Sequence, residues 1–312
     1  MHPIIKVTNL SKHFREFVAV DRLSFTVEQG DVYGFLGQNG AGKSTTIRML
    51  LTLIEPTDGS IELFGMDLRK HRKEILRQVG AVVEKPDVYK YLTAYENLQL
   101  FSKISGGSAI TKSKLLEQLE LVGLQERAHS KVKTFSQGMK QRLGVAVALV
   151  HDPKLIILDE PTNGLDPQGI ADIRNLILHL SHNLKKTVVV SSHLLSEIEL
   201  VANRLLIIDK GRKMVEGKAA ELFDPSNTVI ELATLNNEQA LQQIQQSAWS
   251  SFLQPGRNGN IILKMSRGQI PDFHQALAAM HVPLLSLQPR LSLEDYFLQV
   301  TTGKQHVEAF KD

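Results

Sequence analysis

The residues best suited to chemistry form a glycine-rich segment that matches the pattern GxxxxGK[ST]. Its nine residues are Gly37, Gln38, Asn39, Gly40, Ala41, Gly42, Lys43, Ser44 and Thr45. Glycines let the backbone curl so that N–H groups point at phosphate oxygens, and a helix that begins near Lys43 adds the positive end of its dipole. Lys43 is expected to reach the β- and γ-phosphates, and the Ser44 hydroxyl to ligate Mg²⁺. The segment therefore predicts a nucleoside triphosphate site.

A second group of candidate residues follows the apolar run Leu155–Leu158, which ends in Asp159 and Glu160. Ligands of parallel sheets bind outside the carboxyl ends of the strands. Asp159 is expected to hold Mg²⁺ directly or through water, and Glu160 to act as a general base or to position the attacking water. Two acids after a strand also suit a solvated strand end, but the nearby phosphate loop favours the functional interpretation.

A third candidate is the turn Ser136, Gln137 and Gly138, which leads into a predicted helix. The free N–H groups at the start of a helix bind anions. Taken by itself, the turn is better explained as a helix cap. Both interpretations stay open at this point.

Alternating strands and helices are expected to position these residues over the first two thirds of the chain. The runs Val32–Leu36, Leu155–Leu158 and Thr187–Val190 are continuously apolar, which predicts strands buried on both faces of a parallel sheet. Shorter runs and amphipathic stretches predict further elements. The further strands are Ile4–Val7, Ser24–Val27, Ile61–Phe64, Gly80–Val83 and Leu205–Ile208. The helices are Lys43–Leu53, Lys112–Val122, Gly138–Leu149, Gly169–Leu184 and Leu194–Val201, with a loop at Gly106–Ser108.

The composition changes after Asp224, where Pro225–Asn227 forms a plausible linker. We therefore expect two domains, residues 1–224 and 225–312. The order predicted for the second domain is strand, helix, two strands, helix, strand and a terminal helix, which is typical of a small ferredoxin-like α+β module. An irregular extension of the first domain is the alternative. The predicted elements are Thr228–Ala233, Glu238–Ser247, Trp249–Leu253, Asn260–Met265, Gln269–Met280, Val282–Leu287 and Leu293–Val300.

Composition and charge exclude several classes of protein. The 312 residues suffice for about two domains, and 42% hydrophobic with 22% charged residues fits neither a disordered nor a collagen-like chain. Without cysteine there is no disulfide, thiolate metal site or cysteine nucleophile. A net charge of +3 gives no support for a nucleic-acid partner. The sequence shows neither a membrane-spanning apolar run nor a signal-peptide pattern, so we expect a cytoplasmic location.

Together, the motifs resemble those of ATP-binding cassette (ABC) ATPases. The phosphate loop, the Phe-Ser-Gln-Gly-Met turn at 135–139, the acidic strand, Gly-Leu-Asp at 164–166 and Ser-His at 192–193 follow the order and spacing of that family. The resemblance covers about residues 3–220. It implies an α/β P-loop cassette with a parallel-sheet core, an antiparallel β subdomain and a helical subdomain, and it implies ATP and Mg²⁺ as ligands.

The resemblance also implies a homodimer that forms on ATP binding and encloses two ATP molecules. Each ATP would lie between the phosphate loop of one copy and Ser136, Gln137 and Gly138 of the other, with Asp166 at the dimer seam. His193 takes the place of the switch histidine that contacts the γ-phosphate and the attacking water. Phe14 takes the adenine-stacking position, with packing in the core as the alternative.

Two departures from the family pattern are chemically relevant. The turn at 135–139 reads Phe-Ser-Gln-Gly-Met where Leu-Ser-Gly-Gly-Gln is usual, although the serine and the second glycine are retained. Glu84 stands where most members have glutamine. Carboxylate oxygens suit Mg²⁺, so Glu84 joins Ser44 and Asp159 as a candidate metal ligand. The added negative charge near the γ-phosphate predicts slower or more metal-dependent hydrolysis.

Glu84, the following Pro86 and residues 92–98 resemble the ATPases of bacterial bacitracin-resistance and lantibiotic-immunity exporters. The resemblance implies an ATP-hydrolysing subunit, peripheral on the cytoplasmic face of the membrane, that drives a separate integral membrane permease. The permease is expected to dock at Glu84–Asn97, and no nucleic acid is expected to bind. The alternative is a soluble ABC ATPase that acts on nucleic acid or ribosomes. A P-loop kinase or GTPase is disfavoured by the Ser-Gln-Gly turn.

Overall fold

A computed structural model describes residues 3–15, 17–105, 110–222, 228–257 and 260–290. The chain divides into two compact units, Met1–Ala219 and Ala220–Asp312. This division lies five residues before the predicted domain boundary. Within the described part of the chain, no helix is both long and apolar enough to cross a membrane.

A six-stranded sheet forms the centre of the first unit, in the order β10-β9-β3-β8-β7-β6. Neighbouring strands from β9 to β6 are parallel, and β10 is antiparallel to β9. The strands β3, β7 and β8 are buried along their whole length, as the continuous apolar runs predict. The strand bounds are β3 Val32–Leu36, β6 Val79–Val82, β7 Leu155–Leu158, β8 Thr187–Ser192, β9 Arg204–Asp209 and β10 Arg212–Lys218.

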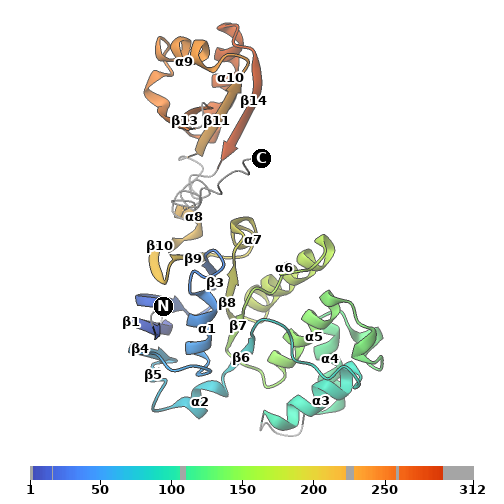
Figure 1. The fold of residues 1–312 in the computed structure, drawn as a ribbon. Helices are drawn as coiled ribbons and strands as arrows, with labels where there is room; N and C mark the ends of the chain where they lie inside the picture. Colours follow the sequence, from blue (N-terminus) through green and yellow to red (C-terminus); the bar gives the residue numbers. More distant parts are fainter. Residues whose placement is uncertain (1–2, 16, 106–109, 223–227, 258–259, 291–312) are drawn as a thin grey trace, which may run out of the picture. The chain divides into compact units, whose positions relative to one another are not determined.

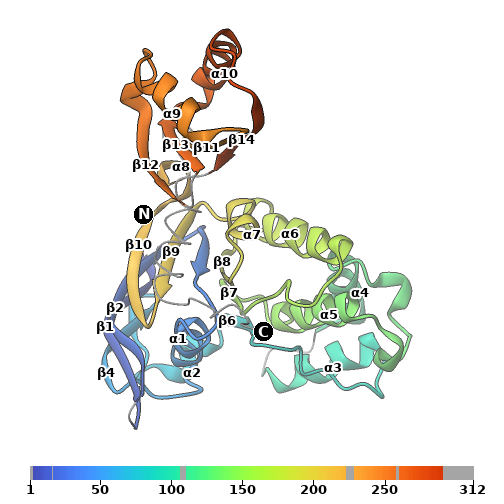
Figure 2. The ribbon, with the colours of Figure 1, turned by 45° about the horizontal axis from the view of Figure 1, so that its top comes forward.

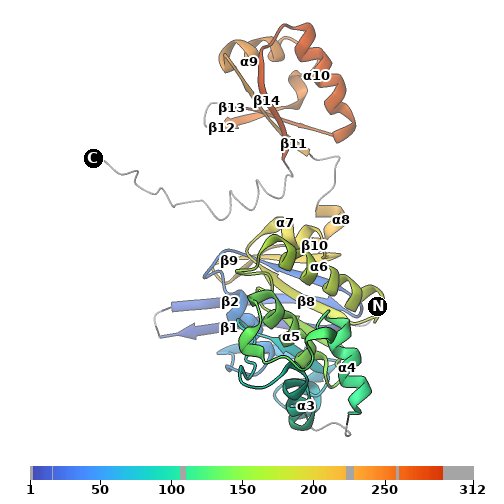
Figure 3. The same cartoon turned by 90° about the vertical axis from the view of Figure 1, so that its right-hand side faces the viewer.

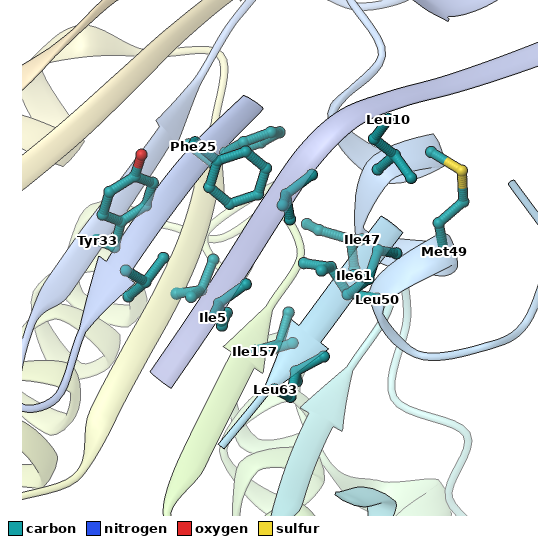
Figure 4. Close-up of a cluster of buried hydrophobic side chains, with 14 of the residues drawn as sticks. Ile5, Leu10, Phe25, Tyr33, Ile47, Met49, Leu50, Ile61, Leu63 and Ile157 are labelled. Carbon is teal, nitrogen blue, oxygen red and sulfur yellow. The ribbon is translucent and has the colours of Figure 1, made fainter. Parts of the chain in front are cut away.

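A second, antiparallel sheet covers one face of the first and has the order β2-β1-β4-β5. The main hydrophobic core lies between the two sheets and includes side chains from helix α1, Lys43–Leu50 (Figure 4). Phe25 joins the sheets, because its ring lies 6.0 Å from Tyr33 and 5.6 Å from Phe35 between centroids. The strand bounds are β1 Pro3–Phe14, β2 Phe17–Glu28, β4 Asp58–Leu63 and β5 Met66–Asp67.

Three helices, α3, α4 and α5, group together on one side of the six-stranded sheet (Figures 1 and 2). Helix α3 was not predicted, although Thr93 and Glu96 form a capping box at its start. Hydrogen bonds from Thr93 lower the pKa of the Glu96 carboxyl. The helix bounds of the first unit are α2 Arg72–Leu76, α3 Ala94–Ile104, α4 Lys112–Leu121, α5 Gln137–Leu149, α6 Pro167–His182 and α7 Leu195–Glu199; α8 at Ala219–Leu222 follows at the division between the units. The short 3₁₀ helices η1 and η2 are Gln125–Arg127 and Val132–Thr134.

Two glycines allow close contacts between α5 and its neighbours. A Cβ atom at Gly80 on β6 would overlap the carbonyl oxygen of Ala148 on α5. A Cβ atom at Gly144 on α5 would lie only 2.6 Å from the Cβ of Pro86. Helix α5 is therefore in direct contact with both the sheet and the segment that follows β6.

The second unit has the strand and helix order of a split βαβ module (Figure 3). Its antiparallel sheet has the order β12-β13-β11-β14, so the third strand lies between the first and second. Both helices contribute buried side chains to one core. The bounds are β11 Thr228–Thr234, α9 Asn237–Gln245, β12 Leu253–Arg257, β13 Asn260–Met265, α10 Ile270–Ala279 and β14 Leu284–Arg290, with the 3₁₀ helices η4 Ser250–Phe252 and η5 Arg267–Gln269.

One predicted strand of this unit is wrong. The segment predicted as a strand at Trp249–Leu253 contains the 3₁₀ helix Ser250–Phe252, and β12 begins only at Leu253. A 3₁₀ turn brings positions i and i+3 to the same side. Trp249 and Phe252 accordingly lie 5.4 Å apart between ring centroids, and Trp249 also contacts Phe273 at 5.1 Å. The predicted loop at 106–108, linker at 225–227 and helix at 293–300 lie outside the described residues.

We predict that Gly80→Ala lowers the free energy of unfolding by about 1–3 kcal/mol, because the new methyl group must displace the backbone of α5. Chemical denaturation monitored by circular dichroism measures the change. Gly268→Ala is the control, since a Cβ atom there meets no heavy atom within 4 Å. Equal stability of the Gly80→Ala variant and the wild type would contradict the close contact between β6 and α5.

We also predict that removal of residues 225–312 leaves a first unit that unfolds cooperatively and still binds ATP. Every residue proposed for the phosphate site lies in the first unit. Calorimetric unfolding and a nucleotide titration of the shortened chain measure this. A folded fragment that does not bind ATP would place part of the site in the second unit.

Candidate functional site

The glycine-rich segment forms the connection between β3 and α1. Gly40 and Gly42 have φ angles of 83° and 104°, in the left-handed region that favours glycine. Gly42 also approaches the backbone closely, because a Cβ atom there would lie 2.6 Å from the carbonyl oxygen of Ala19. The Gly37 N–H donates to the carbonyl oxygen of Ser192 at 3.3 Å. These constraints fix the loop against the ends of the central strands.

The ammonium group of Lys43 is buried, with 5% of the residue exposed. It donates to the carbonyl oxygens of Gly37 at 2.6 Å and Gln38 at 3.3 Å. Its Nζ atom also lies 3.0 Å from Oε1 of Glu160. A buried charge needs such partners to offset the loss of water. The structure thus brings the predicted phosphate-binding lysine and the predicted catalytic acid into direct contact.

Asp159 lies at the end of β7, beside the start of α1. Its Oδ1 atom accepts hydrogen bonds from Ser191 at 2.6 Å and Ser44 at 3.3 Å. Its Oδ2 atom is buried and has no hydrogen-bond partner. An unpaired, buried carboxylate oxygen beside a hydroxyl fits Mg²⁺, which binds oxygen ligands and usually needs only one or two protein carboxylates. Among the described residues, no group of three or more His, Asp or Glu side chains forms a complete metal site.

Glu160 and His193 lie at the ends of β7 and β8. The Nδ1 atom of His193 lies 2.8 Å from Oε2 of Glu160. The backbone N–H of Glu160 donates to the hydroxyl of Ser191 at 2.8 Å, and Glu160 has a left-handed φ of 49°. A non-glycine residue in that region is uncommon and is often held by its surroundings at a functional site. The two residues predicted to be catalytic are therefore adjacent.

Glu84 follows β6 and forms an ion pair with Arg48 of α1, a residue that the sequence analysis did not single out. Both side chains are exposed to solvent. No hydrogen bond or ion pair in the described part of the chain joins Glu84 to Ser44 or Asp159, its predicted companions at the metal. The guanidinium of Arg48 thus offsets the additional negative charge that Glu84 brings to this position.

The turn formed by Ser136, Gln137 and Gly138 starts helix α5. The Ser136 hydroxyl accepts a hydrogen bond from the Met139 N–H at 3.2 Å and caps the helix. In the same way, Asp166 caps α6 by accepting from the Gly169 N–H at 2.9 Å. The two helix starts are neighbours, because a Cβ atom at Gly138 would lie 3.9 Å from the Cα of Gly169. No described hydrogen bond or ion pair joins Ser136, Gln137 or Gly138 to the phosphate loop.

Phe14 lies at the end of β1 and is not part of the hydrophobic core, since 46% of the residue is exposed. Nζ of Lys12 lies 5.0 Å from the centroid of the Phe14 ring. A cation at this distance is attracted to an aromatic ring. The geometry leaves Phe14 accessible for stacking and disfavours the alternative of core packing.

A hydrogen-bond network centred on Glu197, next to the segments that carry Glu160 and His193, was not predicted. Oε2 of Glu197 accepts from the hydroxyls of Thr162 and Ser192, each at 2.7 Å. The sequence signal was weak, because Glu197 is one acidic residue on a short helix. Only the fold brings the segment that follows Glu160 beside the segment that precedes His193.

Comparisons with known proteins agree with this geometry. Residues 20–163 match the ABC transporter family. The bacitracin transport ATP-binding protein BcrA of Bacillus licheniformis is 43% identical over 304 residues, covering 97% of this chain and 99% of that protein. The lantibiotic transport ATP-binding protein SrtF of Streptococcus pyogenes is 38% identical over 235 residues, covering 75% of this chain and 97% of that protein.

A solved structure extends the likeness to three dimensions. The dimeric structure of an ATP-binding cassette in a post-hydrolysis state, bound to ADP and Pi, has a TM-score of 0.62 to this chain and is 26% identical. The likeness covers 69% of this chain and 98% of that one. Together with the matches above, it confirms the prediction of an α/β P-loop cassette.

We predict that Lys43→Ala weakens ATP binding by on the order of 10²-fold or more, because a charge-assisted contact to phosphate is lost and Glu160 loses its buried cation. Titration with a fluorescent ATP analogue measures the change in dissociation constant. Lys112→Ala removes an exposed lysine from α4 and is the matched control. A Lys43→Ala variant with the wild-type dissociation constant would refute the assignment of the phosphate site.

Proposed function

The chain belongs to the ABC transporter family, and from this premise we propose that it is the ATPase subunit that drives a separate membrane permease to export a peptide antibiotic, a drug or a similar compound. The observation that carries the proposal is the match to a bacitracin transport protein over 97% of this chain, which includes the second unit. The alternative of a soluble ATPase acting on nucleic acid or ribosomes is disfavoured, because the names of these relatives refer to transport.

The residues at the ends of β3, β7 and β8 suit ATP hydrolysis. In the proposal, Lys43 and the N–H groups of the phosphate loop hold the β- and γ-phosphates. Ser44 and Asp159 would hold Mg²⁺, with Glu84 as a further candidate ligand. When bound, Mg²⁺ would supply positive charge that offsets the negative charge developing on the phosphate groups. Phe14 offers its exposed ring to the adenine base.

Glu160 can change partners during this reaction. Its Oε1 atom contacts Lys43, and its Oε2 atom contacts His193. When phosphate oxygens take over the charge of Lys43, Oε1 becomes available to accept a proton from the attacking water. His193 then keeps the Glu160 carboxylate oriented while Glu160 acts as the general base. In the proposal, the ion pair between Lys43 and Glu160 is the arrangement before ATP binds, and the phosphates replace it.

The second half of the proposed ATP site comes from another copy of the chain. Ser136, Gln137 and Gly138 begin α5, and Asp166 begins α6 beside them. The start of α5 offers N–H groups to an anion. We propose that these residues close over ATP bound to the phosphate loop of a partner copy, so that ATP holds the dimer together.

The proposed permease contact is the segment Glu84–Asn97, at the cytoplasmic face of the membrane. Tyr91 in this segment is 82% exposed. The side chain of buried Asn97 holds the segment in shape, because it accepts from the Tyr89 N–H and donates to the carbonyl oxygens of Tyr89 and Thr93. An exposed tyrosine on a fixed loop is suited to an interface, since aromatic residues are enriched in such contacts.

The transport function is tested by purifying the chain from its native membranes with any integral membrane protein that associates with it, and measuring ATP hydrolysis of that complex in lipid vesicles. Peptide antibiotics and amphiphilic drugs are added in turn. We expect at least one of these compounds to raise the rate of hydrolysis above that of the complex without cargo. Failure of the chain to associate with any membrane protein, together with copurification of RNA or ribosomes, would favour the alternative.

We predict that Glu160→Gln lowers the ATP hydrolysis rate by roughly 10²-fold or more while leaving ATP binding intact, because the amide cannot accept the proton of the attacking water. The variant is expected to accumulate as a dimer with MgATP, measured by size-exclusion chromatography. Adding Ser136→Arg prevents this dimer, because a bulky cation occupies the place of the γ-phosphate.

Glu238→Gln makes the same chemical change on α9 of the second unit and is the control for both measurements. If the Glu160→Gln variant hydrolyses ATP at the wild-type rate, Glu160 is not the catalytic carboxylate. A dimer that persists with Ser136→Arg would remove Ser136 from the shared site.

A further inference from the structure

We propose that Glu197 is a positioning residue that fixes the segment carrying Glu160 relative to the segment carrying His193. The inference deepens the proposed function and rests on it, because it assumes that Glu160 and His193 act in ATP hydrolysis. Glu197 lies on the short helix α7, where its neighbours Leu195 and Ile198 are buried and anchor the helix. Its carboxylate faces the ends of β7 and β8.

The contacts of Glu197 complete a closed ring. Oε2 of Glu197 accepts from the Thr162 hydroxyl and from the Ser192 hydroxyl, each at 2.7 Å. Thr162 lies two residues after Glu160, and Ser192 immediately precedes His193. The bond between His193 and Glu160, at 2.8 Å, closes the ring. The relative position of the catalytic pair is therefore held from both sides.

Ser192 has a second role in this ring. While it donates to Glu197, its hydroxyl oxygen accepts from the Leu194 N–H at 3.0 Å. The backbone on both sides of His193 is thus tied to the carboxylate of Glu197. Hydrogen bonds to a charged acceptor are shorter and stronger than those between neutral groups. This makes Glu197 the common anchor of both segments.

The hydrogen-bonded group lies beside an open pocket. This pocket of about 290 Å³ lies between α6, α7 and the end of β8, and its lining includes Ile170, Val190 and Leu194 beside Glu197. Packing on this side of the loop is therefore incomplete, and the hydrogen bonds to Glu197 add to what the packing of α7 supplies.

The function of Glu197 differs from that of Glu160. Its Oε2 atom is engaged by two hydroxyl donors, and it contacts neither the phosphate loop nor Lys43 through any described hydrogen bond or ion pair. It therefore acts through the residues it holds. A misplacement of about 1 Å at a reacting group can reduce the rate by on the order of 10²-fold. Loss of Glu197 should accordingly lower kcat and leave the affinity for ATP unchanged.

The test compares Glu197→Ala and Glu197→Gln in the full-length chain. We expect Glu197→Ala to lower kcat by about 10- to 100-fold, with the dissociation constant for MgATP within about twofold of the wild type. Glu197→Gln should retain most of the activity, because its amide oxygen still accepts both hydroxyls. Glu238→Ala makes the matched change at an exposed glutamate of α9 in the second unit and should leave kcat unchanged.

Combination with His193→Ala separates positioning from a general effect on stability. If Glu197 acts by placing His193, Glu197→Ala causes little further loss in the His193→Ala background, measured by single-turnover hydrolysis. An equal loss of rate in both backgrounds would overturn the proposal, as would an unchanged kcat in Glu197→Ala. Thr162→Val and Ser192→Ala remove the donors one at a time, so the test does not depend on the folding of a single variant.

The same experiment distinguishes this proposal from the proposed function. If Glu160→Gln and His193→Ala both retain wild-type hydrolysis, the assignment of the catalytic pair fails. If those variants lose activity but Glu197→Ala, Thr162→Val and Ser192→Ala do not, only the positioning role of Glu197 is refuted.

Discussion

The carboxylate of Glu160, shared between Lys43 and His193, is the interaction on which the arrangement of the site depends. Three adjacent strands, β3, β8 and β7, end at the same edge of the sheet. The loop with Lys43 follows β3, Glu160 follows β7, and His193 follows β8. A buried ammonium and a buried carboxylate are costly to desolvate unless they remain together. Each therefore limits where the other can lie.

Much of this arrangement could be predicted from the sequence because it depends on local patterns. The glycines around Lys43 are required by backbone angles, and the continuous apolar runs of β7 and β8 indicate burial on both faces. The ion pair between Arg48 and Glu84 could not be predicted in this way, since its partners are 36 positions apart in the sequence. The two hydrogen bonds to Glu197 likewise depend on contacts that only the fold creates.

The second unit illustrates the difference between element order and element bounds. The order of strands and helices was sufficient to predict a split βαβ module, and the sheet order β12-β13-β11-β14 agrees with it. The segment at Trp249 was wrongly predicted as a strand because aromatic residues favour strands in general. Here the contacts of Trp249 with Phe252 and Phe273 favour a tight turn instead. Local propensity was overruled by a contact with a distant helix.

The glycine contacts of α5 have a mechanical consequence. Gly80 and Gly144 leave no room for a side chain of their own, so the backbone of β6 and the ring of Pro86 lie directly against α5. A displacement of Pro86 toward Gly144 would therefore press directly on the backbone of α5. Ser136 lies eight positions before Gly144, which corresponds to about 12 Å along a helix. Helix α5 thus connects the segment after β6 to the Ser136 turn, so a displacement at Pro86 would reach that turn along a single continuous helix.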